Sequence, residues 1–144
     1  MNVSSKGHYG LLALAELVDN YKLRRAVQVK EIAHNQHVPL QYLGQIMVAL
    51  RRGHLVHAVR GPMGGYMLAR PPETITVKEV LEVLEGPSAG FEIQAQMHSR
   101  SVSRVTQRLI ETWVRGLRAM EKIMDETTLA DLCKPDKEAL MYYI

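Results

Sequence analysis

The sequence predicts a mainly helical protein with one small β-hairpin and a long helix late in the chain. Apolar residues recur at helical spacing in four separate stretches before residue 87. A Gly- and Pro-rich turn separates two short strand-like runs, and a continuous amphipathic pattern extends over residues 101–126. With 144 residues the chain can build one ordinary core, or a small domain with an extension.

The first two helices are predicted over residues 5–20 and 29–36. They are separated by a basic loop, "NYKLRRA". The predicted inward face of the first helix consists of Leu11, Leu14, Ala15 and Val18.

A helix-turn-helix is predicted next. His37 lies where the second helix must end, and histidine tolerates the left-handed conformation better than most residues. Pro39 suits the first turn of a helix over residues 39–52, because a proline there loses no hydrogen bond. Gly53 is expected to end that helix in the left-handed conformation. The predicted core face is Leu43, Ile46, Met47 and Leu50.

The runs "LVHAVR" and "YMLAR", joined by "GPMGG", predict a hairpin over residues 55–70. Thr76 and Glu79 have the spacing of a capping box, which predicts a helix that ends at Gly86. A short last helix after Glu126 is expected to be capped by Thr127 or Thr128.

The long helix over residues 101–126 would extend about 39 Å, which is more than the width of a small domain. It carries a main apolar stripe and a second one beside it. Because so little other chain is available to cover both stripes, the helix is expected to need two partners, its own domain and another copy of the chain. The predicted dimerisation residues are Val105, Leu109, Trp113, Leu117 and Met120.

Positive charge is concentrated in the first half of the chain. Residues 1–72 carry nine Lys or Arg against three Asp or Glu, whereas residues 73–144 carry nine against twelve. Five of the six histidines also lie in the first half. This asymmetry indicates that the first half binds a polyanion. Uneven distribution of solvated surface charges would give the same numbers of basic and acidic residues.

The glycines of "VRGPMGGY" do not match a nucleotide-binding loop. A P-loop requires Lys-Ser/Thr before a helix, and a dinucleotide fingerprint requires Gly-x-Gly-x-x-Gly opening a helix. Here a strand follows, and the spacing of Gly61, Gly64 and Gly65 differs. Without a paired nucleophile and base, metal-ligand spacing or a cofactor loop, the sequence gives almost no support to an enzyme.

The order of elements predicts a winged helix-turn-helix, with helix 39–52 in the major groove of DNA and the hairpin reaching the minor groove. Glutamines 41 and 45 are the expected base readers and Arg60 the expected minor-groove side chain, beside a Gly/Pro turn that lets the backbone approach the duplex. A solvated helix face and a plain turn are the competing interpretations. The full set of candidate DNA contacts is Gln41, Tyr42, Gln45, Arg51, Arg52, Arg60, Gly61, Gly64, Lys6 and Lys30.

Four segments resemble the bacterial winged-helix regulator family of IscR, NsrR and CymR. They are "SSKGHYGLLAL", "VKEIAHNQHVPLQYLGQIMVALRRGHLV", "VRGPMGGYMLARPPETITVKEVLEVLEG" and "TLADL". The resemblance extends to about Leu132 and implies a homodimer with crossing long helices that controls transcription through DNA, usually as a repressor. Gly44 stands where relatives often carry an acidic residue, so their operator preference is not transferred.

Several members of that family sense iron–sulfur status, nitric oxide or redox through a cluster held by three cysteines. This chain has one cysteine, Cys133, outside the usual loop. No cofactor is therefore expected, and a cluster would need atypical ligands such as His8, His34 or His98. Cys133 itself is expected to be a small buried apolar residue rather than a redox switch.

These observations predict a DNA-binding domain over residues 1–86, a sensor-type loop over 87–100, and a dimerisation helix with a C-terminal segment over 101–144. The expected function is a homodimeric regulator, usually a repressor, that reads a palindromic operator with helix 39–52 and the wing at 60–65. The effector would be a small molecule or a protein.

The alternative is a winged-helix protein-interaction module without sequence-specific DNA binding. The N-terminus lacks a signal-peptide pattern, and no apolar run is long enough for a membrane span, so a cytoplasmic location is expected.

Overall fold

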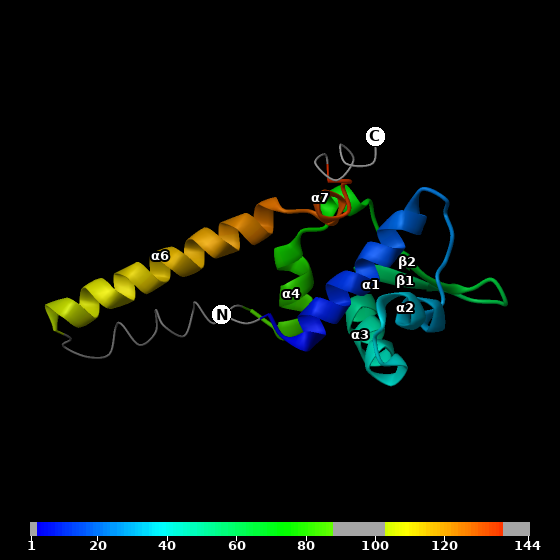
Figure 1. Ribbon diagram of the computed structural model, residues 1–144, viewed down its shortest axis with the longest axis horizontal. Helices are drawn as coiled ribbons and strands as arrows, with labels where there is room; N and C mark the ends of the chain where they lie inside the picture. Colours follow the sequence, from blue (N-terminus) through cyan, green and yellow to red (C-terminus); the bar gives the residue numbers. More distant parts are fainter. Residues whose placement is uncertain (1–2, 88–102, 137–144) are drawn as a thin grey trace.

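The computed structural model describes residues 3–87 and 103–136 and shows a helical body, a two-stranded wing and one projecting helix (Figure 1). The predicted order of helices and hairpin is confirmed, with boundaries that differ by a few residues. The elements are α1 (Ser5–Tyr21), α2 (Val29–Gln36), α3 (Leu40–Arg52), β1 (Val56–Val59), β2 (Gly65–Leu68), the 3-10 helix η1 (Pro72–Thr74), α4 (Val77–Glu85), α6 (Arg104–Glu126) and α7 (Leu129–Leu132).

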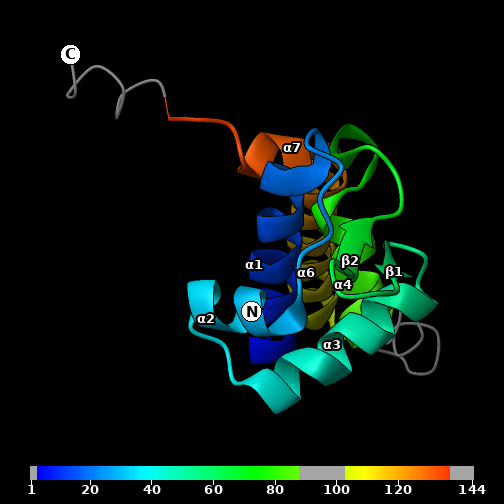
Figure 2. The same ribbon diagram turned by 90° about the vertical axis from the view of Figure 1, so that its right-hand side faces the viewer.

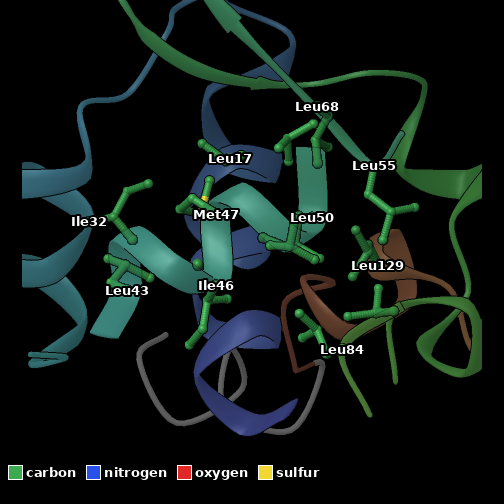
Figure 3. Packing of buried hydrophobic residues seen from close by; sticks show 14 of the residues in the cluster. Leu17, Ile32, Leu43, Ile46, Met47, Leu50, Leu55, Leu68, Leu84 and Leu129 are labelled. Carbon is green, nitrogen blue, oxygen red and sulfur yellow. The ribbon is translucent and has the colours of Figure 1, made fainter. Parts of the chain in front are cut away.

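The core lies where α1, α2, α3 and α4 meet, and α3 contributes most to its centre (Figure 3). The four predicted core residues of α3, Leu43, Ile46, Met47 and Leu50, are fully buried. Burial of each such side chain contributes about 1.5–3 kcal/mol, so this one face holds α3 firmly against the body. The opposite face of the helix is thereby left toward solvent.

The predicted apolar face of α1 is confirmed at Leu14, which is fully buried, and in part at Leu11 and Val18, which pack against the core. Leu11, Ala15 and Val18 are only partly buried, and the buried positions are Gly7, Gly10, Ala13, Leu14 and Leu17. The reason is the close approach of α4. A Cβ atom at Gly10 would lie 2.2 Å from Cδ1 of Leu84, so α4 approaches α1 closely at a glycine, which a count of apolar side chains overlooks.

The turns before and after α3 agree with the prediction in part. His37 ends α2 in the left-handed conformation, with φ 54° and ψ 42°, as predicted. Pro39 is the N-cap of α3 rather than a residue of its first turn. Gly53 is the C-cap of α3, as predicted, but the predicted left-handed conformation is wrong, because its φ is −79° and His54 is the left-handed residue, with φ 59°. Gly53 instead lies against α4, where a Cβ atom would be 2.5 Å from Cγ1 of Val83.

The capping box predicted for α4 forms only in part. The hydroxyl of Thr76 accepts from the N–H of Glu79 at 3.1 Å. The Glu79 carboxylate accepts from the guanidinium of Arg70. The complete box is found at α7, where Thr128 and Asp131 cap each other, so Thr128 rather than Thr127 is the cap.

The C-terminal part of the chain returns to the body through α7. The N–H of Leu129 donates to the carbonyl of Ile75, and the N–H of Val77 donates to the carbonyl of Thr127, each at 2.9 Å. Leu129 is buried in the core. These contacts fix the base of α6, which then projects away from the body (Figure 1). None of the helices in the described ranges has the length and apolar character needed to span a bilayer.

Candidate nucleic-acid interface

The outward face of α3 presents two glutamines that are free to make new hydrogen bonds. Gln41 and Gln45 are exposed and lie one helical turn apart. Neither side chain makes a hydrogen bond with a residue in the part of the chain that the structure describes. Gly44 lies between them, and a Cβ atom there would meet nothing within 4 Å. This surface can therefore approach another molecule closely and offer both amide donors and acceptors.

A groove beside α3 brings together two cations from different helices. Its volume is about 500 Å³, and its walls include Lys6 of α1 and Arg52 of α3. Gln45 lies on the same groove. The structure thus brings Lys6 of α1 together with two predicted site residues of α3 that are far from it in the sequence. Lys30 is exposed on α2 and does not line this groove.

Tyr42, another predicted contact, is partly buried beneath the same surface. Its ring packs edge-on against Tyr9 of α1, with the ring centroids 5.8 Å apart. The ring therefore helps to hold the start of α3 against α1, and only its polar end would be available to a ligand.

The geometry of the wing accounts for glycine at three positions of its loop, Gly61, Gly64 and Gly65. β1 pairs antiparallel with β2, and Arg60 follows β1 with an exposed side chain. The N–H of Gly64 donates to the carbonyl of Gly61 at 2.9 Å, which closes a tight turn. Gly61 has φ 106°, a conformation that favours glycine. A Cβ atom at Gly65 would lie 2.4 Å from the carbonyl oxygen of Val27.

Val27 also anchors the wing to the body, a contact that the sequence pattern does not predict. Its N–H donates to the carbonyl of Tyr66 at 2.9 Å, and the N–H of Tyr66 donates back at 2.8 Å. Val27, which follows the basic loop, thus forms an isolated antiparallel bridge with Tyr66 of β2. The signal in the sequence was weak, because one valine before α2 does not make a strand pattern.

Three arginines on α3 and the wing have no ion-pair partner among the described residues. Arg25 pairs with Glu31 at 2.7 Å, and Arg70 pairs with Glu79. By contrast, Arg51, Arg52 and Arg60 are exposed and form no ion pair within residues 3–87 and 103–136. Figure 2 shows α3 along the lower edge of the body, with the wing beside its C-terminal end. Unpaired guanidinium groups in this position create a positive potential that attracts phosphates.

The apolar face predicted for α6 divides into two parts. Met120 and Met124 line a small groove with Leu81 of α4, near the base of the helix. Farther along the projecting part, Val105 is 77% exposed, and Leu109 and Trp113 are each 60% exposed. Leu117 is partly buried. No residue of α6 is buried, so the outer part of the stripe is uncovered by the described chain.

Cys133 lies at the end of α7 and is partly exposed. Burial raises the pKa of its thiol, and the negative charge of Asp19 raises it further. The thiolate, which is the form that binds metals, is therefore disfavoured at neutral pH. The expectation of a buried cysteine is met only in part, because Cys133 has intermediate exposure.

A thiolate-bound iron–sulfur cluster does not fit these residues. Such clusters take mostly cysteine ligands, and each chain supplies only one thiol. In the described ranges, no group of three or more His, Cys, Asp or Glu is placed to hold a metal, and this covers His8 and His34. His98 and nearly all of the predicted sensor-type loop, residues 87–100, lie outside those ranges.

Residues 3–135 match the Rrf2 family, described as an iron-dependent transcriptional regulator. The HTH-type transcriptional regulator CymR of Bacillus subtilis is 34% identical, over all of both chains. IscR of Cereibacter sphaeroides is 37% identical, over 93% of this chain and 88% of its own length. Both relatives are named as regulators and not as enzymes.

Solved structures agree with these relationships. CymR of B. subtilis matches with a TM-score of 0.76 and 32% identity, over 92% of this chain and 96% of its own. IscR of T. potens matches with a TM-score of 0.78 and 35% identity, over 99% and 97%. The chain described above is therefore a winged-helix, DNA-binding type of protein that belongs to the Rrf2 family of transcriptional regulators.

Proposed function

We propose that the protein is a homodimeric repressor that reads a palindromic operator with α3 and the wing at residues 60–65. The main support for this proposal is that α3 and the wing expose polar and charged groups side by side. Two glutamines without hydrogen-bond partners and two unpaired arginines lie on α3, and a third unpaired arginine lies on the wing. A surface of this kind combines the electrostatic attraction that gives affinity with the polar groups that distinguish bases.

Each group on this surface has a proposed role. Gln41 and Gln45 contact base edges in the major groove, where a glutamine amide can pair with adenine. Arg60 enters the adjacent minor groove, and Gly61 and Gly64 hold the turn that presents it. The proposed phosphate contacts are Lys6, Lys30, Tyr42, Arg51 and Arg52, which fix the register of the protein on the duplex.

The proposed dimer forms through the uncovered apolar face of α6. Its residues are Val105, Leu109, Trp113, Leu117 and Met120, the last of which also lines the groove at α4 of its own chain. A two-fold axis between two such helices would present two copies of α3 to one face of the duplex. A palindromic operator with half-sites about one helical turn apart follows from that symmetry.

The protein is proposed to regulate transcription without a bound cofactor. It is proposed to do so in the cytoplasm. The three functional regions are residues 1–86 for DNA, 87–100 for an effector, and 101–144 for dimerisation. A small molecule or a protein would be the effector. Anaerobic purification followed by an absorption spectrum and metal analysis tests this part. Colour and stoichiometric iron would contradict it, whereas a colourless protein would support it.

DNA binding is tested by retention of the protein's own promoter fragment at increasing salt. The wild type should lose affinity steeply as salt rises, because bound phosphates release counterions. Arg51→Glu and Arg60→Glu should each abolish retention, whereas Arg115→Glu, which reverses an exposed charge on the polar side of α6, should not. Equal behaviour of all three variants would contradict the proposal and favour a protein-interaction module.

A further inference from the structure

The tip of the wing carries an apolar side chain that the fold does not use. Met63 is 87% exposed, more than any other large apolar side chain in the described ranges. It takes no part in the core cluster. Exposure of this size means that the side chain makes few contacts with the rest of the chain. Its burial in a partner would remove most of its apolar surface from water.

The backbone around Met63 is fixed before any partner binds. The turn runs from Gly61 to Gly64 and is closed by their hydrogen bond of 2.9 Å. Pro62, at the second position, restricts φ and prepares the turn. Gly64 leaves no room for a side chain, since a Cβ atom there would be 2.2 Å from the carbonyl oxygen of Val59. The turn therefore holds Met63 at the tip of the wing, between β1 and β2, so that little conformational entropy is lost on binding.

Nothing in this turn requires a methionine. The third position of such a turn accepts most residue types, and polar ones are common in turns. An apolar side chain at a solvent-exposed tip costs solubility and gives the hairpin no packing. Its apolar surface is available to a partner outside the described chain, and Arg60, which directly precedes the turn, favours an anionic one.

We propose that Met63 acts as an apolar wedge that enters a base step of the minor groove beside Arg60 and bends the operator. Side chains such as Met, Leu and Phe unstack a base step from the minor groove and kink the duplex toward the major groove. Methionine is long and unbranched, so it can enter a narrow groove that a β-branched residue would not fit. Arg60 supplies the electrostatic attraction to that groove, and Met63 supplies the deformation.

This inference rests on the proposed function, and it extends that function from binding to DNA bending. It also predicts indirect sequence preference. The step beneath the wing should be a flexible pyrimidine–purine step, because such steps are the easiest to unstack. Specificity at that step would then arise without a hydrogen bond to a base.

The test uses the full-length protein and a duplex that the wild type selects from a random-sequence pool. 2-Aminopurine placed at the step beneath the wing reports unstacking, and energy transfer between dyes at the duplex ends reports the bend. The variants are Met63→Ala, Met63→Gln and Met63→Leu. Leu132→Gln, an exposed apolar residue of α7, serves as the control. Thermal melting checks that every variant folds.

The wild type, Met63→Leu and Leu132→Gln should each raise the 2-aminopurine fluorescence and bend the duplex. Met63→Ala and Met63→Gln should lose both signals and bind roughly tenfold more weakly, while they keep the salt dependence of the wild type. Wild-type binding without unstacking, or bending that persists in Met63→Ala, would overturn the wedge and leave the proposed function intact. Failure to select any salt-sensitive duplex would overturn both.

Discussion

A Cβ atom added to Gly64 would lie 2.2 Å from the carbonyl oxygen of Val59. The two residues face each other at the point where β1 leads into the turn of the wing. No side chain can be accommodated at that distance, and the obstacle is backbone rather than a movable side chain. Gly64 is therefore required by the hairpin itself, independently of any contact with DNA.

Gly64→Ala should open the tip of the wing. The new methyl group must push the turn away from Val59, which breaks the hydrogen bond between the Gly64 N–H and Gly61. We expect a loss of about 2 kcal/mol in the free energy of unfolding. The measurements are thermal melting and hydrogen exchange at the amide of residue 64. An unchanged melting temperature with a protected amide would show that the close contact has been overestimated.

Gly44→Ala should have the opposite effect on stability. Gly44 lies inside α3, and a Cβ atom there would meet nothing within 4 Å. Alanine in a helix interior is favoured over glycine by about 1 kcal/mol, which corresponds to a rise of about 4 °C in melting temperature. Gly53→Ala is the matched control, since its methyl group would collide with Val83 and lower the melting temperature. A destabilised Gly44→Ala would mean that this position is packed after all.

The sequence predicted α3 well because its core residues are all large and regularly spaced. It described α1 less completely, because two of the buried positions, Gly7 and Gly10, have no side chain to count. The left-handed residue after α3 was misplaced for a related reason: glycine was assigned to the turn, whereas the close packing of α4 is what requires Gly53. In both places tertiary packing decided the use of glycine, and local sequence patterns do not record packing.

The candidate site was predictable where it depends on one element and unpredictable where it depends on several. The exposure of Gln41 and Gln45 follows directly from the amphipathic pattern of α3. The groove that unites Lys6 with Arg52 needs the relative placement of α1 and α3. Likewise, the pairing of Val27 with Tyr66 joins segments that are distant in the sequence, and no local pattern predicts it.

Asp131 should make the stability of α7 depend on pH in the acid range. Its carboxylate accepts from the Lys134 ammonium at 2.6 Å and from the N–H of Thr128 at 3.0 Å. The hydrogen bond from Lys134 is the largest cause, followed by those from Thr128, and together they lower the pKa of Asp131 from 3.8 to about 2. Because the folded-state pKa is depressed, the stabilisation is present above pH 3.8 and is lost as the pH falls through about 2.

Asp131→Asn should therefore melt at a lower temperature than the wild type near pH 6, and the difference should shrink between pH 4 and pH 2. Thermal melting over that range measures it. Asp125→Asn, on α6 and outside the capping box, removes the same charge and serves as the control. A difference between wild type and Asp131→Asn that is constant with pH would show that the charge of Asp131 does not stabilise the cap.

Salt dependence should separate the proposed phosphate contacts from the proposed base contacts. Arg51→Ala should reduce the slope of log affinity against log salt by about 1 per subunit, with an equal loss of affinity for all sequences. Gln45→Ala should keep the slope and relax the preference at one base pair, with a cost of about 1–3 kcal/mol at the preferred base. Titrations of selected and scrambled duplexes at several salt concentrations measure both. Identical slopes for Arg51→Ala and the wild type would remove Arg51 from the set of phosphate contacts.

Trp113→Glu should dissociate the proposed dimer. Trp113 is 60% exposed in the chain described here, and it lies one helical turn from Leu109, which is equally exposed. If a second copy covers this face, the substitution buries an unpaired carboxylate in an apolar interface, which is strongly unfavourable. Sedimentation equilibrium should then give the mass of one chain, whereas Arg115→Glu, on the polar side of the same helix, should retain the mass of two. The Trp113→Glu monomer should also lose most of its affinity for a palindromic duplex, because each half-site would then be bound independently. A wild-type protein that sediments as a monomer would contradict the dimer directly, and it would leave the exposed face of α6 to a different partner.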